Sequence, residues 1–489
     1  MMSLVNKDKS PRLFQFMRYF GLFVGCMAKF VSGSIFTFNV YQGDIKSLFN
    51  YTQTEVELQS SLLNLGLGIG FIPGVLYDKF GPFWTSAAGL IVSVGSYMLL
   101  WSTTKFVPFY KNNSWLMGIY FLLCGLGSAF TYMVALNTNI MNFDKKYRGT
   151  IVGLLNSFIA GSPSVFVQIY LHVLTGSGGT KYANFLVFFA TLFAVVGIMC
   201  MLFLRIYTDD FQDDTVKIIP DNESINGTNT VDTCRKESQN GTEMNSISTS
   251  QDTSSSCFSN NNDELSDKDS MSLRQIVCNL DYHLFSWMFV FAAAIGLVFL
   301  NNLTTISKSV RLSQHDSVLL ILIPISNAIV SFSLGFLSDV LKDKIPRMTL
   351  LLASCVLFTV SVLLAILKGS AFGVLVISTI LCGASTGIIW TLSPTVMSER
   401  FCLQNIGRNW GMTILLAAVV GFGIQEIFGH LYDHQLAHAQ GGNCFGLLCV
   451  RGGLIAGLVS GILSVLVCIV YMTKRRIQRF LAQRRSTES

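Results

Sequence analysis

Charge is what this sequence has least of. Only 13% of its 489 residues are Asp, Glu, Lys or Arg, whereas 51% are hydrophobic, and the mean hydropathy is +0.52. A water-soluble domain typically carries about 25% charged residues, so the chain has about half the charge that a water-facing surface needs. This shortage excludes an ordinary soluble protein.

The apolar residues instead gather in long runs. A helix needs about 20 successive apolar residues to cross ~30 Å of hydrocarbon, and runs of this length recur along the chain. The sequence therefore predicts an all-α membrane protein of twelve transmembrane helices in two six-helix bundles. The predicted spans are 19–40, 57–76, 83–103, 115–136, 149–173 and 182–204, then 283–305, 317–337, 348–367, 371–392, 410–430 and 452–472.

The distribution of basic residues predicts the orientation. The run at 19–40 is too long for the apolar part of a secretory signal peptide, and no clear cleavage site follows it, so we expect it to be the first span. Positively charged segments favour the cytoplasmic side. If the N-terminus is cytoplasmic, 21 Lys and Arg lie in the cytoplasmic tails and short loops, and 8 lie in the external loops. Of the remaining five, Lys29 lies within a span and four lie in the long central loop. The tails at 1–18 and 474–489 are both predicted to be cytoplasmic.

The segment 209–270 separates the predicted halves at 19–208 and 271–473, and its composition is different. It is rich in Ser, Thr, Asn and Asp, with 14 acidic and 4 basic residues. So little apolar surface cannot offset the entropy of ordering the chain. We predict a disordered, acidic cytoplasmic linker.

The linker offers a test of the orientation because it contains glycosylation sequons at Asn222, Asn226 and Asn240. A cytoplasmic linker never meets the glycosylation machinery, so we expect no glycan at these positions. A protease site inserted near Asn240 should be cleaved from the cytosolic side. A glycan at Asn226 would overturn the predicted orientation.

Six of the twelve cysteines fall within the predicted spans, where a free thiol behaves as a small hydrophobic side chain. Cys444 and Cys449 differ, because they lie in the loop that is predicted outside, between the last two spans. An oxidising compartment permits a bridge there. We favour a disulfide between them over two free thiols, although sequence alone does not determine pairing.

The loops after the second and eighth spans repeat one pattern, a glycine followed four residues later by an aspartate. Such repetition between halves indicates a transporter built from two related bundles. Glycine lets helices approach closely, and a carboxylate can hold the opposite half in one state and release it in another. A plain basic loop that anchors orientation is the alternative. The candidate gating residues are Gly74, Asp78, Lys79 and Gly81 in the first copy and Gly335, Asp339 and Arg347 in the second.

The repeated loop resembles the one between helices 2 and 3 of the major facilitator superfamily, and further segments resemble its nodulin-like branch. The resemblance covers nearly the whole chain except the linker. It implies the two-bundle fold and a transport role but supplies no substrate. The segments that carry it include Gly33-Ser-Ile-Phe-Thr-Phe-Asn-Val-Tyr41, Tyr51-Thr-Gln53, Asn142-Phe143, Arg148-Gly149, Gly161-Ser-Pro-Ser164, Gln168-Ile-Tyr170, Asn301-Asn-Leu303, Ser398-Glu-Arg-Phe401 and the two loop cysteines.

Lys29 is the strongest single-residue signal. It is the eleventh of 22 residues in the first predicted span, where a charge costs at least about 2.5–3.5 kcal/mol. No acidic residue falls near the midplane of a span to pair with it. We predict an unpaired ammonium that faces a water-filled cavity and binds an anion; snorkelling to the interface or bonding to backbone carbonyls at a bend are the alternatives. Monocarboxylate transporters of the superfamily have a similar lysine, but this chain has Asn327 in place of their Asp/Arg pair in the eighth helix.

Other polar groups within the spans are weaker candidates. Asn327, Ser385 and Thr386 would either line the cavity as substrate-binding residues or bond between helices. Glu426, in the outer quarter of the eleventh span, is the candidate for ion coupling.

Histidines gather near the outer end of the eleventh span, at spacings that could place three imidazoles along one helical face. The same residues also fit an ordinary helix-end pattern, and motif matches of this kind have a high false-positive rate, so we predict no metal site and no cofactor. The residues concerned are His430, Asp433, His434 and His438.

We therefore expect a multi-pass secondary transporter, not an enzyme, that moves a small organic solute, such as a monocarboxylate anion, by alternating access. Amino acids and metal complexes are alternative cargoes. A non-transporting sensor that signals through the central loop is the alternative from another functional class. The expected partners are a small-molecule substrate, the lipid bilayer and a coupling ion, with no nucleic acid; we expect a monomer in the plasma membrane or a vacuolar or lysosomal membrane.

Overall fold

The computed structural model describes residues 11–174, 176, 179–207, 273–401, 403–437 and 444–488. The predicted linker at 209–270, with its sequons, and His438 lie outside these residues. All regular elements in the described part are helical. They are α1 (Pro11–Ser32), η1 (Gly33–Thr37), α2 (Phe38–Phe49), α3 (Gln53–Gly68), α4 (Phe71–Thr103), α5 (Val107–Lys111), α6 (Ser114–Asn142), α7 (Arg148–Gln168), η2 (Ile169–Val173), α8 (Gly179–Phe203), α9 (Leu273–Val277), α10 (Leu280–Ser309), η3 (Ser313–His315), α11 (Asp316–Val340), α12 (Arg347–Lys368), α13 (Phe372–Arg400), η4 (Leu403–Asn405), α14 (Ile406–Ala437) and α15 (Leu448–Glu488).

The twelve predicted crossings correspond to these helices. The described residues contain 11 helical segments that are long and apolar enough to cross a membrane, and one of them, Thr54–Thr103, is 50 residues long. This segment holds two crossings, because Gly81 interrupts α4 with φ +75° and Pro82 starts a new helical stretch. A positive φ is a conformation that glycine adopts without a steric penalty. The all-α fold of twelve crossings is confirmed.

Local sequence explains where several helices begin and end. Thr52 and Glu55 form a capping box at the start of α3: the Glu55 N–H donates to Thr52 Oγ1 at 3.3 Å, and the Thr52 N–H donates to Glu55 Oε2 at 2.8 Å. Asn279 caps α10 by accepting from the Asp281 N–H at 2.9 Å. Asn50 ends α2 in the left-handed conformation, with φ +55°.

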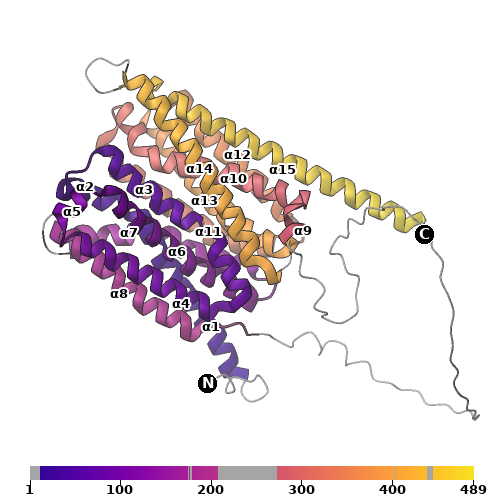
Figure 1. The fold of residues 1–489 in the computed structure, drawn as a ribbon. Coiled ribbons are helices and arrows are strands. Elements are labelled where there is room, and N and C mark those ends of the chain that lie inside the picture. The colour runs from indigo at the N-terminus through magenta and orange to yellow at the C-terminus, as the bar shows by residue number, and fades with distance from the viewer. Residues whose placement is uncertain are drawn as a thin grey trace, which may run out of the picture. The chain divides into compact units, whose positions relative to one another are not determined.

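The helices form two bundles that pack side by side (Figure 1). The N-terminal bundle, α1 to α8, has its own aromatic core, in which Phe185 lies 4.4 Å from Phe189, centroid to centroid. The C-terminal bundle, α10 to α15, forms a second core that also includes Tyr132 of α6 and Val152 of α7. The two bundles therefore share apolar packing in addition to their polar contacts.

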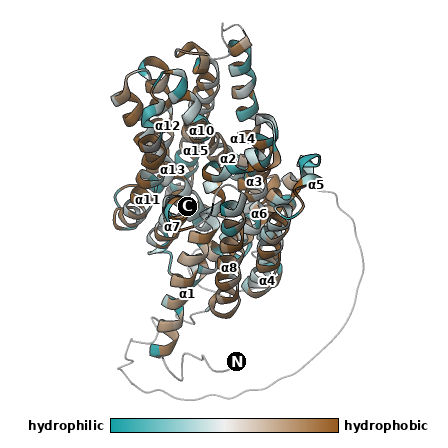
Figure 2. Cartoon of the chain, turned by 90° about the vertical axis from the view of Figure 1, so that its left-hand side faces the viewer, coloured by the Kyte–Doolittle hydropathy of each residue, from teal (hydrophilic) through white to brown (hydrophobic). Residues whose placement is uncertain are grey.

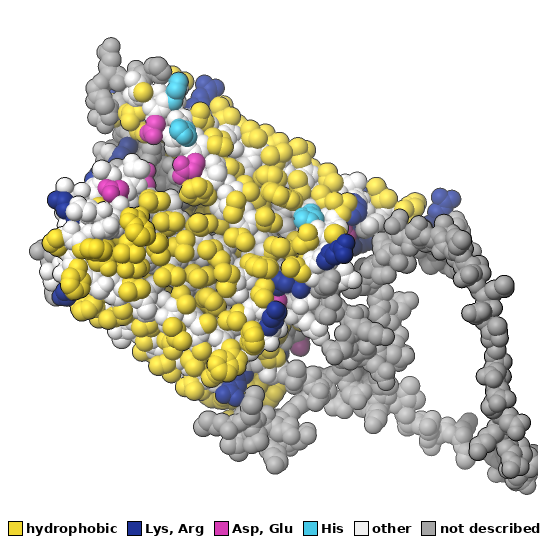
Figure 3. Space-filling model, viewed as in Figure 1, with side chains coloured by type: hydrophobic (Ala, Val, Ile, Leu, Met, Phe, Trp, Pro, Cys, Tyr) yellow, Lys and Arg dark blue, Asp and Glu magenta, His cyan; other side chains and the backbone are white. Residues whose placement is uncertain are grey.

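The outer surface suits a hydrocarbon environment. Figure 2 shows hydrophobic stretches along most of the long helices, and Figure 3 shows apolar side chains covering the middle of the molecule. Ile91 is 72% exposed and Ile329 is 61% exposed, both within membrane-spanning segments. Large exposed apolar faces of this extent indicate contact with lipid. The chain is a multi-pass integral membrane protein.

Candidate functional site

The two repeated aspartates each cap the first turn of a helix in the opposite bundle. Asp78, in α4, accepts hydrogen bonds from the main-chain N–H groups of Gly407 at 3.0 Å and Arg408 at 2.7 Å, at the start of α14. These N–H groups have no partner within their own helix. A carboxylate is favoured there by charge-assisted bonds and by the helix dipole.

Asp339, at the end of α11, makes the equivalent contact in the other direction. Its Oδ1 accepts from the Gly149 N–H at 3.0 Å, and its Oδ2 accepts from the Thr150 N–H and the Thr150 hydroxyl, both at 2.6 Å. Gly149 and Thr150 lie at the start of α7. The structure thus contains two related clamps, and each joins the halves at the end that carries the repeated loops.

Glycines allow the clamps to form because the helix backbones touch. A Cβ placed on Gly74 would lie 2.1 Å from the carbonyl oxygen of Gly407, and one on Gly335 would lie 2.5 Å from the carbonyl oxygen of Gly149. Real Cβ atoms essentially never approach so closely. The glycine four residues before each aspartate therefore faces the opposite half.

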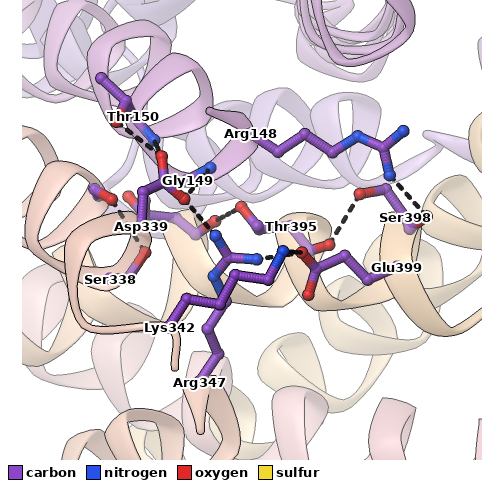
Figure 4. A network of polar contacts seen from close by, with 12 residues as sticks. Arg148, Gly149, Thr150, Ser338, Asp339, Lys342, Arg347, Thr395, Ser398 and Glu399 are labelled. Carbon is purple, nitrogen blue, oxygen red and sulfur yellow. Dashed lines mark hydrogen bonds and ion pairs between the residues drawn. The ribbon is translucent and has the colours of Figure 1, made fainter. Parts of the chain in front are cut away.

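The second clamp contains a buried charge network, shown in Figure 4. Arg347, at the start of α12, contacts Asp339 with one guanidinium nitrogen and Glu399 of α13 with the other. Lys342 lies 3.9 Å from Glu399. Arg148 crosses between the halves and donates to the Ser398 carbonyl oxygen at 3.2 Å.

The remaining gating candidates lie beside the clamps. Lys79 directly follows Asp78 in α4 and is exposed, and Gly81 supplies the bend that separates the two crossings of the segment Thr54–Thr103. Glu399 and Arg148 have no sequence signal for a place in the clamp, although both occur in segments that carry the family resemblance.

In this conformation Lys29 is buried instead of facing a water-filled cavity, and its part in binding an anion stays a prediction. It lies in the last turn of α1 and is 0% exposed. Its Nζ donates to Asn156 Oδ1 at 3.3 Å and lies 3.1 Å from the centroid of the Tyr132 ring. An amide oxygen and the face of an aromatic ring both stabilise a cation, so the ammonium is not without partners. Both partners are neutral and leave its charge uncompensated.

Both groups that contact the ammonium also bond to the opposite half. Asn156 Nδ2 donates to the Trp390 carbonyl oxygen at 2.6 Å, in α13. The Tyr132 hydroxyl accepts from Trp410 Nε1 at 3.4 Å, in α14.

The other predicted substrate-binding residues form hydrogen bonds inside the C-terminal bundle. Ser385 is 0% exposed; its hydroxyl donates to Leu381 in its own helix, and its carbonyl oxygen accepts from Ser354 of α12. It therefore lies inside the C-terminal bundle. Thr386 is partly exposed and bonds to Cys382 in its own helix. Asn327 is also partly exposed, and its Oδ1 accepts from Ser331 at 3.1 Å.

An apolar pocket of about 400 Å³ lies between α1, α7 and α11. Both bundles contribute to it. Phe30 and Ser157, which line it, directly follow Lys29 and Asn156 in the chain. The other lining residues are Phe158, Gly161, Val165, Ala328 and Ile329.

A disulfide joins Cys444, before α15, to Cys449 in the first turn of α15, the pair that the sequence favours. Glu426, the coupling candidate, is exposed on α14, as is His430. No group of three or more His, Cys, Asp or Glu positioned to hold a metal ion occurs among the described residues.

Comparison with known proteins agrees with this architecture. The family model described as Major Facilitator Superfamily matches residues 19–425. "Probable transporter MCH1" of Debaryomyces hansenii is 21% identical over 441 residues, which cover 86% of each chain. The protein of the same name from Yarrowia lipolytica is 26% identical over 223 residues, which are 42% of this chain and 45% of that relative.

Solved structures share the fold at low sequence identity. The proton:xylose symporter XylE superposes with a TM-score of 0.64 at 12% identity, covering 94% of this chain and 96% of that one. The human organic anion transporter MFSD10 gives a TM-score of 0.57 at 10% identity, covering 92% and 99%. Together with the two related bundles and their paired clamps, the match along residues 19–425 shows that this chain belongs to the major facilitator superfamily.

Proposed function

We propose that the chain is a secondary transporter that moves a small organic monoanion, such as a monocarboxylate, by alternating access. The observation that carries the proposal is the pair of clamps, one from each half, at the same end of the molecule. Each clamp is made of hydrogen bonds to a carboxylate, which can exchange with water when the halves separate. Closing both clamps shuts the end that the basic loops predict to be cytoplasmic.

Lys29 supports an anionic cargo. The ammonium is fully buried, and its contacts with Asn156 and Tyr132 leave one positive charge uncompensated. A single carboxylate would neutralise this charge, whereas a dianion would bring a second negative charge that Lys29 cannot match. That one structural neighbour is an organic anion transporter agrees with this class of cargo.

The coupling ion is part of the same proposal. FucP and XylE, two of the structural neighbours, are proton symporters. Glu426 is exposed on α14, so it is a weak candidate for a buried proton carrier. Proton coupling would therefore use Lys29 itself, the ionisable group that lies buried at mid-depth in the first span.

Counterflow in proteoliposomes tests the proposal. A thermal-shift screen against small carboxylic acids, amino acids and metal complexes first identifies ligands, because a ligand stabilises the state that binds it. Vesicles loaded with the best acid should then accumulate the same labelled acid transiently. A ligand that stabilises the protein without any counterflow would favour the sensor alternative, and stabilisation by an amino acid or metal complex alone would refute the anion assignment.

A further inference from the structure

We propose that Asn156 is a positioning residue that links the state of the Lys29 ammonium to the contact between the two halves, an inference that rests on the transport function proposed above. Asn156 is 3% exposed and uses both ends of its amide. Its oxygen accepts from Lys29 at 3.3 Å, within the N-terminal half. Its nitrogen donates to the Trp390 carbonyl oxygen at 2.6 Å, in the C-terminal half.

The two bonds depend on one another. An amide oriented with its oxygen toward Lys29 necessarily has its N–H₂ on the opposite side, where Trp390 lies. The ammonium also polarises the amide and makes its N–H₂ a stronger donor to the Trp390 carbonyl. The buried ammonium, which contacts the neutral Asn156 and Tyr132 in the described part of the chain, thus holds Asn156 in the orientation that joins α7 to α13.

Tyr132 reinforces the arrangement from a second helix. Its ring lies under the ammonium, 3.1 Å from Nζ to the centroid, and its hydroxyl accepts from Trp410 at 3.4 Å. Both neutral partners of Lys29 are therefore anchored on the opposite half. In the empty protein, solvation of the ammonium by these groups favours the conformation in which the halves are in contact.

An anion changes this balance. A carboxylate that binds Lys29 competes with the Asn156 oxygen and the Tyr132 ring for the ammonium. Asn156 then loses the partner that fixes its orientation, and the bond to Trp390 weakens. Cargo binding in this way releases the contact between halves, and the empty protein changes conformation more slowly than the loaded one.

The distance between the halves can be measured without knowing the cargo. Spin labels at F80C, in α4 next to Asp78, and at K344C, in the loop between α11 and α12, report the separation of the two halves in the ligand-free protein, because both positions are exposed. C278S removes the free cysteine that is exposed among the described residues, and C234S, C257S and C402S remove the three cysteines outside them. In N156A the ratio of clamps-closed to clamps-open protein should fall by up to about tenfold, the effect expected from losing one hydrogen bond between neutral groups. N139A is the matched control, because Asn139 is equally buried but donates to Ala135 in its own helix, so its closed population should stay at the wild-type level.

N156D tests whether the contact between the halves depends on the bond from Asn156 to Trp390 or only on the bond between Asn156 and Lys29. Its carboxylate still binds the ammonium but has no N–H for the Trp390 carbonyl, so the closed population should fall as it does in N156A. A wild-type distance distribution in either N156A or N156D would overturn the inference. The proposed function fails separately, if wild-type vesicles show no counterflow of any acid that shifts the melting temperature.

Discussion

Replacing Lys29 by methionine should reduce uptake of the anion at least about 30-fold while the protein continues to fold. Loss of one partner of a buried, hydrogen-bonded charge pair typically costs about 2–5 kcal/mol, and 2 kcal/mol corresponds to a factor of about 30 in affinity. Lys29 is 0% exposed, and its volume is close to that of methionine. Because an unneutralised charge leaves the protein interior, the melting temperature should stay the same or rise.

The Lys29 experiment needs variants that separate charge from packing. K29A leaves a cavity and should lower the melting temperature. K29R keeps the charge, so its uptake should lie between those of K29M and the wild type, because a planar guanidinium cannot occupy the same position over Tyr132. K105M is the matched control: Lys105 also lies over an aromatic ring, 5.2 Å from the Trp101 centroid, but is exposed. Wild-type uptake by K29M would show that Lys29 is a structural lysine.

The sequence located Lys29 but not its partners. Depth within the span marks a charge as unusual, because hydrocarbon penalises it wherever it lies. Asn156 and Tyr132 carry no comparable signal, since neutral polar residues within spans commonly form bonds between helices. Asn156 lies 127 residues from Lys29 in the chain, and the order of helix packing decides whether they meet.

For the clamps too, the sequence located the central residues but not their partners. Repetition in the chain identified Asp78 and Asp339, but the partners of Asp78 lie 329 and 330 residues away. Those partners are main-chain N–H groups, which every residue except proline carries, so no side-chain pattern marks them. Helix starts opposite the aspartates could have been sought, because the first N–H groups of a helix need acceptors.

Ser385 shows the limit of arguments from depth alone. The hydroxyl lies within a predicted span, as a cavity residue would, but the structure places it inside the C-terminal bundle, where its carbonyl oxygen accepts from Ser354. A serine can satisfy its hydroxyl on the preceding turn of its own helix and then face either direction. The face of the helix, rather than the depth, determines its role.

Replacing Arg347 by methionine should cause the largest loss of stability among the clamp variants. Its side chain is 4% exposed, and it lies between Asp339, which is 6% exposed, and Glu399, which is 12% exposed. Removing the arginine leaves two carboxylates buried side by side, with Lys342 3.9 Å from one of them. Breaking a buried pair by removing one partner costs about 3–5 kcal/mol. For a chain of this length that corresponds to a fall of about 3–5 °C in melting temperature, because the entropy of unfolding scales with length.

Two further variants determine whether the effect comes from charge. R347M combined with D339N and E399Q removes both carboxylates, so the melting temperature should recover although the charge-assisted bonds of the second clamp are gone. K344M, at an exposed position in the same loop, should melt as the wild type does. A melting temperature for R347M within about 1 °C of wild type would contradict the burial argument.

Substitution of Asp78 in the first clamp should reduce the stability of the protein less than substitutions in the second clamp do. The difference measures how much each clamp contributes to holding the closed end together. Asp78 is held by main-chain N–H groups of Gly407 and Arg408. In D78N the single amide oxygen can accept from only one of these two N–H groups and leaves the other without its acceptor, but no opposing charge stays buried, so the loss should be about 1–2 kcal/mol. Asp339 has the same kind of helix-capping bonds and also an arginine that ties it to Glu399. In D339N the Arg347 guanidinium keeps Glu399, so stability should fall by an amount between those of D78N and R347M. If D78N instead proved as damaging as R347M, the first clamp rather than the charge network would hold the closed end together.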